Sequence, residues 1–214
     1  MVAVAAAVLV VVQVGRHDDD APVPDASDPV WRDVPAEAEQ APPQQISRVV
    51  LVRRQDVLDD DNRAIPTILH AMLNQAVAAV MGAPTEEAWR RLISPDDVVG
   101  IKSNEWGKLP TPPALEDAIR TEVLRVGVSE DDVAVDDRGV RRNPVFQRAT
   151  ALINTRPMRT HHWSGLGTCL KNLIMFVPRP QEYHGDACAP LGAVWRLPEL
   201  DGKVRLNVLV MLTP

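Results

Sequence analysis

Apolar and polar residues follow two alternating patterns along the chain. Five short apolar runs, rich in β-branched residues, are typical of buried strands, and they lie at 49–52, 97–104, 133–135, 151–154 and 204–212. Between these runs, apolar residues recur at helical spacing over 65–80, 89–93 and 115–124. Strands that alternate with helices predict an α/β fold, here a three-layer domain with a largely parallel sheet.

The helix ends are marked by residues that cap or interrupt helices. We expect one helix to begin at Asp61 and end at Gly82, and another to begin at Thr111 and end at Gly127. A further helix is expected over 165–176, ahead of a Pro-rich loop. These boundaries divide the folded part into units in which a strand is followed by a helix.

The N-terminal region has a different pattern. Residues 2–14 form an apolar run that is too short to cross a bilayer as a helix but matches the apolar part of a secretory signal. A buried strand or helix of the fold is the alternative interpretation. Residues 16–46 are rich in Pro, Asp and Glu and lack apolar periodicity, as expected of a linker.

We therefore expect a signal-peptide-like or anchor segment at 1–15, a linker at 16–46 and the α/β domain at 47–214. Such an organisation predicts an exported protein, periplasmic or anchored to the membrane on its extracytoplasmic side. Because the strand at 204–212 has the pattern of a central strand and almost nothing follows it, we expect the domain to lack a further C-terminal part.

Charge and polar positions indicate where chemistry could take place. The formal net charge of -6 argues against a nucleic-acid partner held by phosphate contacts. Polar residues gather just after the expected strands, and carboxyl ends of parallel strands are where such sheets bind ligands. These residues are Lys102, Asn104, Asp136, Asp137, Arg138, Asn154 and Arg156. We assign Lys102 and Asp136 as an acid/base pair and expect Asp137 to be an ordinary surface residue.

A glycine-rich segment precedes the helix expected near residue 170. Backbone N–H groups at the start of a helix attract phosphate or carboxylate, and glycines let such a ligand approach closely. Ordinary capping by Ser164 is the alternative. The predicted anion-binding residues are Asn104, Asn154, Ser164, Gly165, Gly167, Thr168, Lys171 and Asn172.

Histidine and cysteine cluster in the last third of the chain. Imidazole and thiolate groups bind zinc or iron, and His161, His184 and Cys188 form the predicted metal site. The alternatives are a disulfide between Cys169 and Cys188 or a Cys169 that is simply buried on its helix. An iron–sulfur cluster is less favoured, because the chain has two cysteines in all and clusters need several.

Several of these segments together resemble the domain of unknown function 362 family. The segment 99–104 (VGIKSN) is similar to the family's GIK-x-N strand, and 151–172, 184–190 and 203–212 resemble its other motifs in the same order. The resemblance covers 48–214 and implies an α/β fold. Some members carry iron–sulfur modules, whose clustered cysteines are absent here, and Val210 stands where many members have an acidic residue.

Two functional hypotheses follow, beside the alternative that the chain is an inactive or truncated fragment whose missing C-terminal part completes the site. The first is a metal-dependent or redox-linked enzyme that acts on a small anionic substrate and exchanges electrons with a redox partner protein. In this hypothesis the histidines and Cys188 hold the metal while Lys102, Asn104 and Lys171 orient the anion. The second is a non-catalytic, extracytoplasmic ligand-binding or assembly protein with a structural disulfide.

Overall fold

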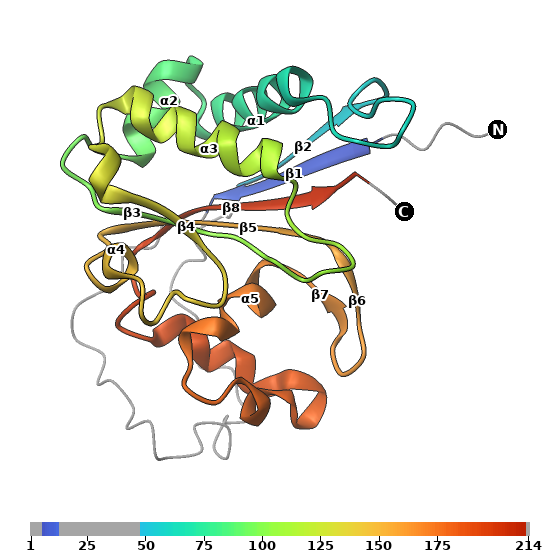
Figure 1. Cartoon of the computed structure of the whole chain (residues 1–214), viewed down its shortest axis with the longest axis vertical. Helices are drawn as coiled ribbons and strands as arrows, with labels where there is room; N and C mark the ends of the chain where they lie inside the picture. The colour runs from blue at the N-terminus through green and yellow to red at the C-terminus, as the bar shows by residue number, and fades with distance from the viewer. Residues whose placement is uncertain (1–5, 13–47, 213–214) are drawn as a thin grey trace, which may run out of the picture.

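The computed structural model describes residues 6–12 and 48–212 and contains a six-stranded sheet (Figure 1). The strands occur in the order β2-β1-β8-β5-β3-β4. Strands β8, β5, β3 and β4 are parallel, whereas β1 is antiparallel to both β2 and β8. The bounds are β1 Ala6–Val12, β2 Arg48–Arg54, β3 Val99–Lys102, β4 Val133–Asp136, β5 Ala151–Pro157 and β8 Val204–Met211. The predicted sheet, largely parallel, is confirmed.

Helices and short helical segments cover both faces of this sheet (Figure 1). One face carries α1 Pro66–Met81, α2 Thr85–Leu92 and α3 Pro113–Val126, with the short η1 Glu130–Asp132 following α3. The other face carries α4 Pro144–Gln147, α5 Cys169–Asn172, η2 Leu173–Phe176, η3 Pro180–His184 and η4 Asp186–Arg196. This arrangement confirms the predicted three-layer α/β domain.

Each face of the sheet has its own apolar core, because successive side chains of a strand point to opposite faces. Ile153 of β5 packs with the core under α1 and α3, whereas its neighbour Leu152 packs with the core under α4 and η4. The second core also explains Gly100 in the middle of β3. A Cβ atom at that position would lie 2.8 Å from the Phe146 ring and 2.7 Å from Leu152, so only glycine fits.

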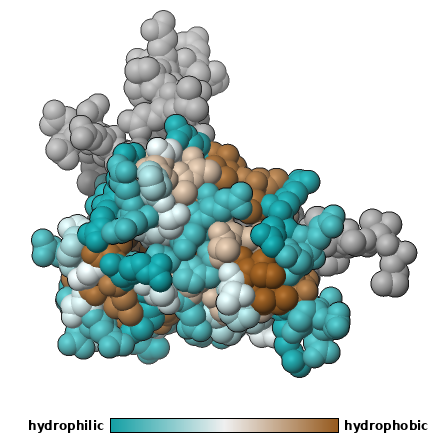
Figure 2. Space-filling view, turned by 90° about the horizontal axis from the view of Figure 1, so that it is seen from above, coloured by the Kyte–Doolittle hydropathy of each residue, from teal (hydrophilic) through white to brown (hydrophobic). Residues whose placement is uncertain are grey.

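A buried carboxylate ties the outer helices together. Glu122 of α3 is 2% exposed, and its Oε1 lies 2.6 Å from His70 Nε2 and accepts hydrogen bonds from Asn74 Nδ2 (2.9 Å) and Arg125 Nη1 (2.7 Å). Asn74 in turn accepts a hydrogen bond from Trp89 Nε1 of α2 at 2.8 Å. The three helices are therefore linked through polar contacts as well as apolar packing. Figure 2 shows the molecule from the side of α1, α2 and α3, where hydrophilic residues cover much of the surface and apolar residues form separate patches.

Two helix starts differ from the sequence predictions by several residues, whereas α3 begins at Pro113, two residues after the predicted Thr111. α1 begins at Pro66 rather than at Asp61, because the Asp59 carboxylate accepts hydrogen bonds from the backbone N–H groups of Asp61 and Arg63 and holds that segment in a turn. The helix predicted over 165–176 begins only at Cys169. The glycine-rich part before it is instead a strand. By contrast, Gly82 and Gly127 end α1 and α3 as predicted, each with a left-handed backbone.

That strand belongs to a small antiparallel hairpin on the lower side of Figure 1. Strand β6 (Arg159–His161) pairs with β7 (Gly165–Gly167), with Arg159 opposite Gly167 and His161 opposite Gly165. The turn between them ends at Gly165, whose φ of 69° is a conformation that glycine adopts readily. The hairpin extends the carboxyl end of β5 beyond the sheet.

The apolar N-terminal run contributes a strand to the sheet. Residues 6–12 form β1, which pairs with β2 on one side and with β8 on the other. This is the strand that the sequence left open as an alternative to a signal-like or anchor segment. The predicted linker at 16–46 lies outside the described residues. Across the described part of the chain, no helix combines the length and the apolar character needed to span a bilayer.

Candidate anion-binding site

The polar residues that follow β3, β4 and β5 do come together at one edge of the sheet. Lys102, at the end of β3, is fully buried, and its Nζ donates a hydrogen bond of 2.6 Å to the Ser103 carbonyl oxygen. The same Nζ lies 2.5 Å from Asp137 Oδ1 and donates to Asn172 Oδ1 at 3.3 Å. Burial is the main influence on the Lys102 pKa and lowers it to about 8, although Asp137 opposes the shift.

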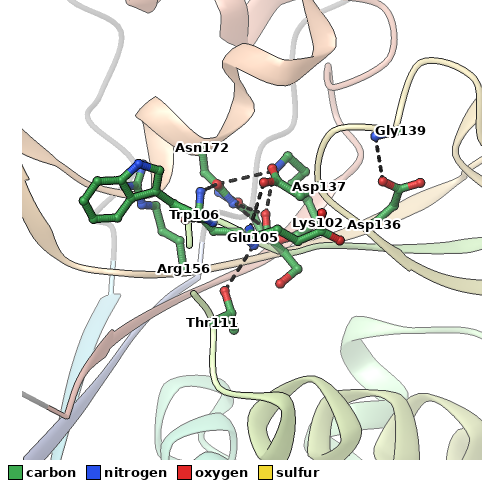
Figure 3. Close-up of polar contacts among 12 residues, drawn as sticks. Lys102, Glu105, Trp106, Thr111, Asp136, Asp137, Gly139, Arg156 and Asn172 are labelled. Carbon is green, nitrogen blue, oxygen red and sulfur yellow. Dashed lines mark hydrogen bonds and ion pairs between the residues drawn. The ribbon is translucent and has the colours of Figure 1, made fainter. Parts of the chain in front are cut away.

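The carboxylate that pairs with Lys102 is not the predicted one. The Asp136 carboxylate accepts hydrogen bonds from Gly139 N (2.7 Å) and Asn143 Nδ2 (3.0 Å) and so holds the turn after β4. Figure 3 shows Asp136 directed towards Gly139 while Asp137 meets Lys102. Asp137 is 4% exposed and also accepts a hydrogen bond from the Glu105 backbone N–H at 2.9 Å. The assignment of Asp136 to an acid/base pair and of Asp137 to the surface is therefore wrong.

Three predicted amide residues form the centre of a closed network. Asn172 Nδ2 donates to Asn154 Oδ1 (2.8 Å) and to the carbonyl oxygens of Ser103 and Thr155 (both 3.1 Å). Asn172 Oδ1 accepts from Asn104 Nδ2 at 3.0 Å. All three asparagines are at most 8% exposed. Their amides join the strand ends to α5 from inside the protein, so they fix the shape of the site and do not present a surface to a ligand.

Positive charge accumulates just outside this network, in a group that we call the cation cluster, formed by Arg156, Arg159 and Lys171. Burial lowers the pKa of all three side chains, and the positive charge of Arg159 also lowers the pKa of Arg156, to about 10. Arg159 Nη1 donates to Asn104 Oδ1 at 2.9 Å. Among the described residues, none of the three forms an ion pair with a carboxylate; Asp137 acts on both arginines only from a distance.

Arg156 is the most deeply buried member of the cluster. Its Nε donates to the Pro157 carbonyl oxygen at 3.1 Å and its Nη1 to the Thr168 carbonyl oxygen at 3.3 Å. Its Nη2 is buried and has no hydrogen-bond partner within the described residues. A Cβ atom on Gly167 would lie 3.0 Å from that Nη2, so the glycine makes room for the guanidinium. An unsatisfied buried donor of this kind is costly and therefore uncommon.

The glycine-rich segment supplies a hairpin strand rather than a helix start. Gly165 and Leu166 are exposed, and Ser164 Oγ lies 2.9 Å from His161 Nδ1 across the turn. The anion site was predicted from backbone N–H groups at the start of a helix, and that part of the prediction is wrong. Lys171, however, lies close enough to Arg156 and Arg159 for their charges to lower its pKa, so it belongs to the cation cluster.

The predicted metal ligands are brought together only in part. The rings of His161 and His184 stack with centroids 5.7 Å apart, whereas the Cys188 thiol contacts the His184 carbonyl oxygen at 4.0 Å. Within residues 6–12 and 48–212, no group of three or more His, Cys, Asp and Glu side chains is arranged to hold a metal ion. The predicted three-ligand set does not converge, because Cys188, a residue of η4, is buried in the second apolar core.

Both cysteines are free thiols, so the alternative disulfide is absent from this structure. Burial raises the pKa of the Cys169 thiol to about 12, even though the positive charge of Arg156 acts in the opposite direction. Cys169 is therefore protonated at neutral pH, and the thiol form is a poor nucleophile. Cys169 is partly buried. Its free thiol agrees best with the interpretation of Cys169 as a small side chain that packs on its helix.

An apolar pocket lies at the same edge of the sheet, on the face covered by α3. Its volume is about 390 Å³. Its wall includes four prolines, and only Asn62 and Arg63 contribute polar side chains; the prolines are Pro110, Pro112, Pro113 and Pro157. Arg156 and Pro157 are neighbours on β5, so the Arg156 side chain points away from the pocket that Pro157 lines. Arg159 adjoins the pocket, because its Nη1 donates a hydrogen bond of 3.2 Å to the carbonyl oxygen of Leu109 in the pocket wall.

Comparisons with protein-family models, with curated proteins and with solved structures found no match to this chain. Membership of the domain of unknown function 362 family therefore stays a prediction from the motifs.

The sequence analysis did not assign Arg156 or Arg159 to the site. Arg156 stands among the polar residues after the strands, but only the structure shows its burial. Arg159 was missed altogether, since nothing in the sequence predicted the hairpin that carries it.

Proposed function

We propose that the cation cluster binds a small anionic ligand that carries a phosphate or carboxylate group. The proposal is carried by one observation, namely the three cationic side chains gathered without a carboxylate partner among the described residues. Gathered cations repel one another, and an anion would relieve that repulsion. The buried, unpaired Nη2 of Arg156 supports the same conclusion.

The location and the surroundings support this function further. The cluster lies at the carboxyl end of β5, which contains Arg156, and this is the edge where parallel α/β sheets bind ligands. The Asn104 side chain fixes Arg159, and the Thr168 carbonyl oxygen fixes Arg156, so both guanidinium groups of the cluster are held in place before any ligand arrives. Groups held in advance bind with a smaller loss of conformational entropy.

Lys102 supports the site indirectly. Its Nζ is fully buried and already contacts Asp137 and Asn172. We propose that it holds the strand ends together rather than transferring protons. A metal-dependent or redox-linked reaction on the bound anion stays a hypothesis, and so does an extracytoplasmic location. The described residues add no support to either.

Calorimetric titration with inorganic tripolyphosphate tests the proposal. The native protein should bind it, and Lys171→Met should bind it about tenfold more weakly, because a charge-assisted hydrogen bond contributes about 1.5 kcal/mol. Lys203→Met is the matched control, since Lys203 is partly buried like Lys171 but precedes β8 at the amino end of that strand. Equal affinities of the two variants, or no binding to the native protein, would refute the proposal.

A further inference from the structure

An exposed tryptophan lies next to the cation cluster. Trp163, in the turn of the β6–β7 hairpin, is 54% exposed. Its ring centroid lies 5.6 Å from that of His161 and 4.7 Å from that of His184. Large aromatic side chains are usually covered in a folded protein, and an exposed ring beside binding groups is an informative exception.

The hairpin connects this ring to the cations. Arg159 and His161 are two residues apart on β6, so their side chains point to the same face of the hairpin. Their cross-strand neighbours are Gly167 and Gly165, which have no side chains to cover that face. Burial is the main cause that lowers the pKa of His161, and the positive charges of the cation cluster lower it further, in agreement with the position of His161 on the same face as Arg159.

A second tryptophan near the site, Trp106, already has cationic side chains over its ring. The Arg159 guanidinium lies over the Trp106 ring, 4.3 Å from its centroid. Lys108 Nζ lies 5.9 Å from the same centroid. Trp106 thus has cations over it, whereas the aromatic contacts of Trp163 among the described residues are with three imidazole rings, those of His161, His162 and His184.

We infer that the ligand is an aromatic anion, such as a nucleotide, whose ring stacks on Trp163 while its anionic group contacts the cation cluster. This inference rests on the proposed function and names the substrate class for the same site. Stacking a base on an aromatic side chain strengthens binding by about tenfold or more and tolerates different bases, because every base has a π-face. Specificity for the exact ring would then come from other contacts.

Two probes that share a triphosphate separate the two claims. ATP and inorganic tripolyphosphate are titrated into the native protein without added metal. ATP should bind about tenfold more tightly than tripolyphosphate. Trp163→Ala should lower the affinity for ATP to that for tripolyphosphate and leave the tripolyphosphate affinity unchanged, and Trp163→Phe should restore most of the preference.

Leu166→Ala is the control for general apolar contact, because Leu166 is 49% exposed on the same hairpin and has no ring. It should keep the preference for ATP. Equal binding of both probes to the native protein overturns the inference and leaves the anion site standing. Equal weakening of both probes by Trp163→Ala also overturns it, because the ring would then act on the shape of the anion site. Absence of tripolyphosphate binding refutes the proposed function and, with it, this inference.

Discussion

Removal of the buried charges of Lys102 and Asp137 should change how stability depends on pH. The pKa of Lys102 is lowered from its ordinary value of 10.5 to about 8 in the folded protein. Below pH 8 the amine is protonated in both the folded and the unfolded state, and the cost of burying it is fully present. Between pH 8 and 10.5 the folded protein has released this proton while the unfolded chain still holds it. The free energy of unfolding therefore rises with pH across this window.

The expected size follows from the shift of about 2.5 pH units, which corresponds to about 3 kcal/mol. The reference is the double variant Lys102→Met/Asp137→Asn, because the single lysine variant would leave a buried carboxylate uncompensated at a cost of about 3–5 kcal/mol. Urea unfolding followed by tryptophan fluorescence, from pH 7 to pH 10.5, gives the difference between the native protein and the double variant. That difference should shift by about 3 kcal/mol in favour of the native protein. A constant difference would show that burial does not hold the Lys102 pKa low.

The helix layer and the thiols supply two further predictions. Glu122→Ala should lower the free energy of unfolding by about 2 kcal/mol, since it leaves His70 and Arg125 without their buried acceptor; an unchanged urea midpoint would contradict this. Thiol titration should count two free thiols in the unfolded protein, and Cys169 should react slowly at pH 8 in the folded state because burial raises its pKa to about 12. A count of zero would indicate a disulfide between Cys169 and Cys188.

The parts of the fold that the sequence predicted well are those with a local physical cause. Gly82 and Gly127 end helices because they adopt the left-handed backbone that a helix end requires. The strand at Val99–Lys102 was predictable from its apolar run between polar flanks. The β6–β7 hairpin was not predictable in the same way, since three-residue strands made largely of glycine and polar residues carry no apolar period.

The site was predicted less completely, because its geometry depends on which face a side chain occupies. Asp136 and Asp137 are neighbours, and in extended chain neighbouring side chains point to opposite sides. The choice of the residue that pairs with Lys102 therefore depended on the position of β4 beside β3, which the sequence does not contain. The cation cluster was hidden for a similar reason: Lys171 is separated from Arg156 by the whole hairpin, and only the turn at Gly165 brings them together.

The place of β8 in the sheet has a consequence for how the protein is made. It follows every other described strand in the sequence, yet it lies between β1 and β5 and joins the β1–β2 pair to the parallel strands. During synthesis the ribosome releases these two groups of strands long before the strand that connects them. Until β8 emerges, the edges of β1 and β5 stay unpaired, and unpaired edges are prone to associate with other chains. The nascent protein should therefore depend most on chaperones in the interval just before β8 is complete.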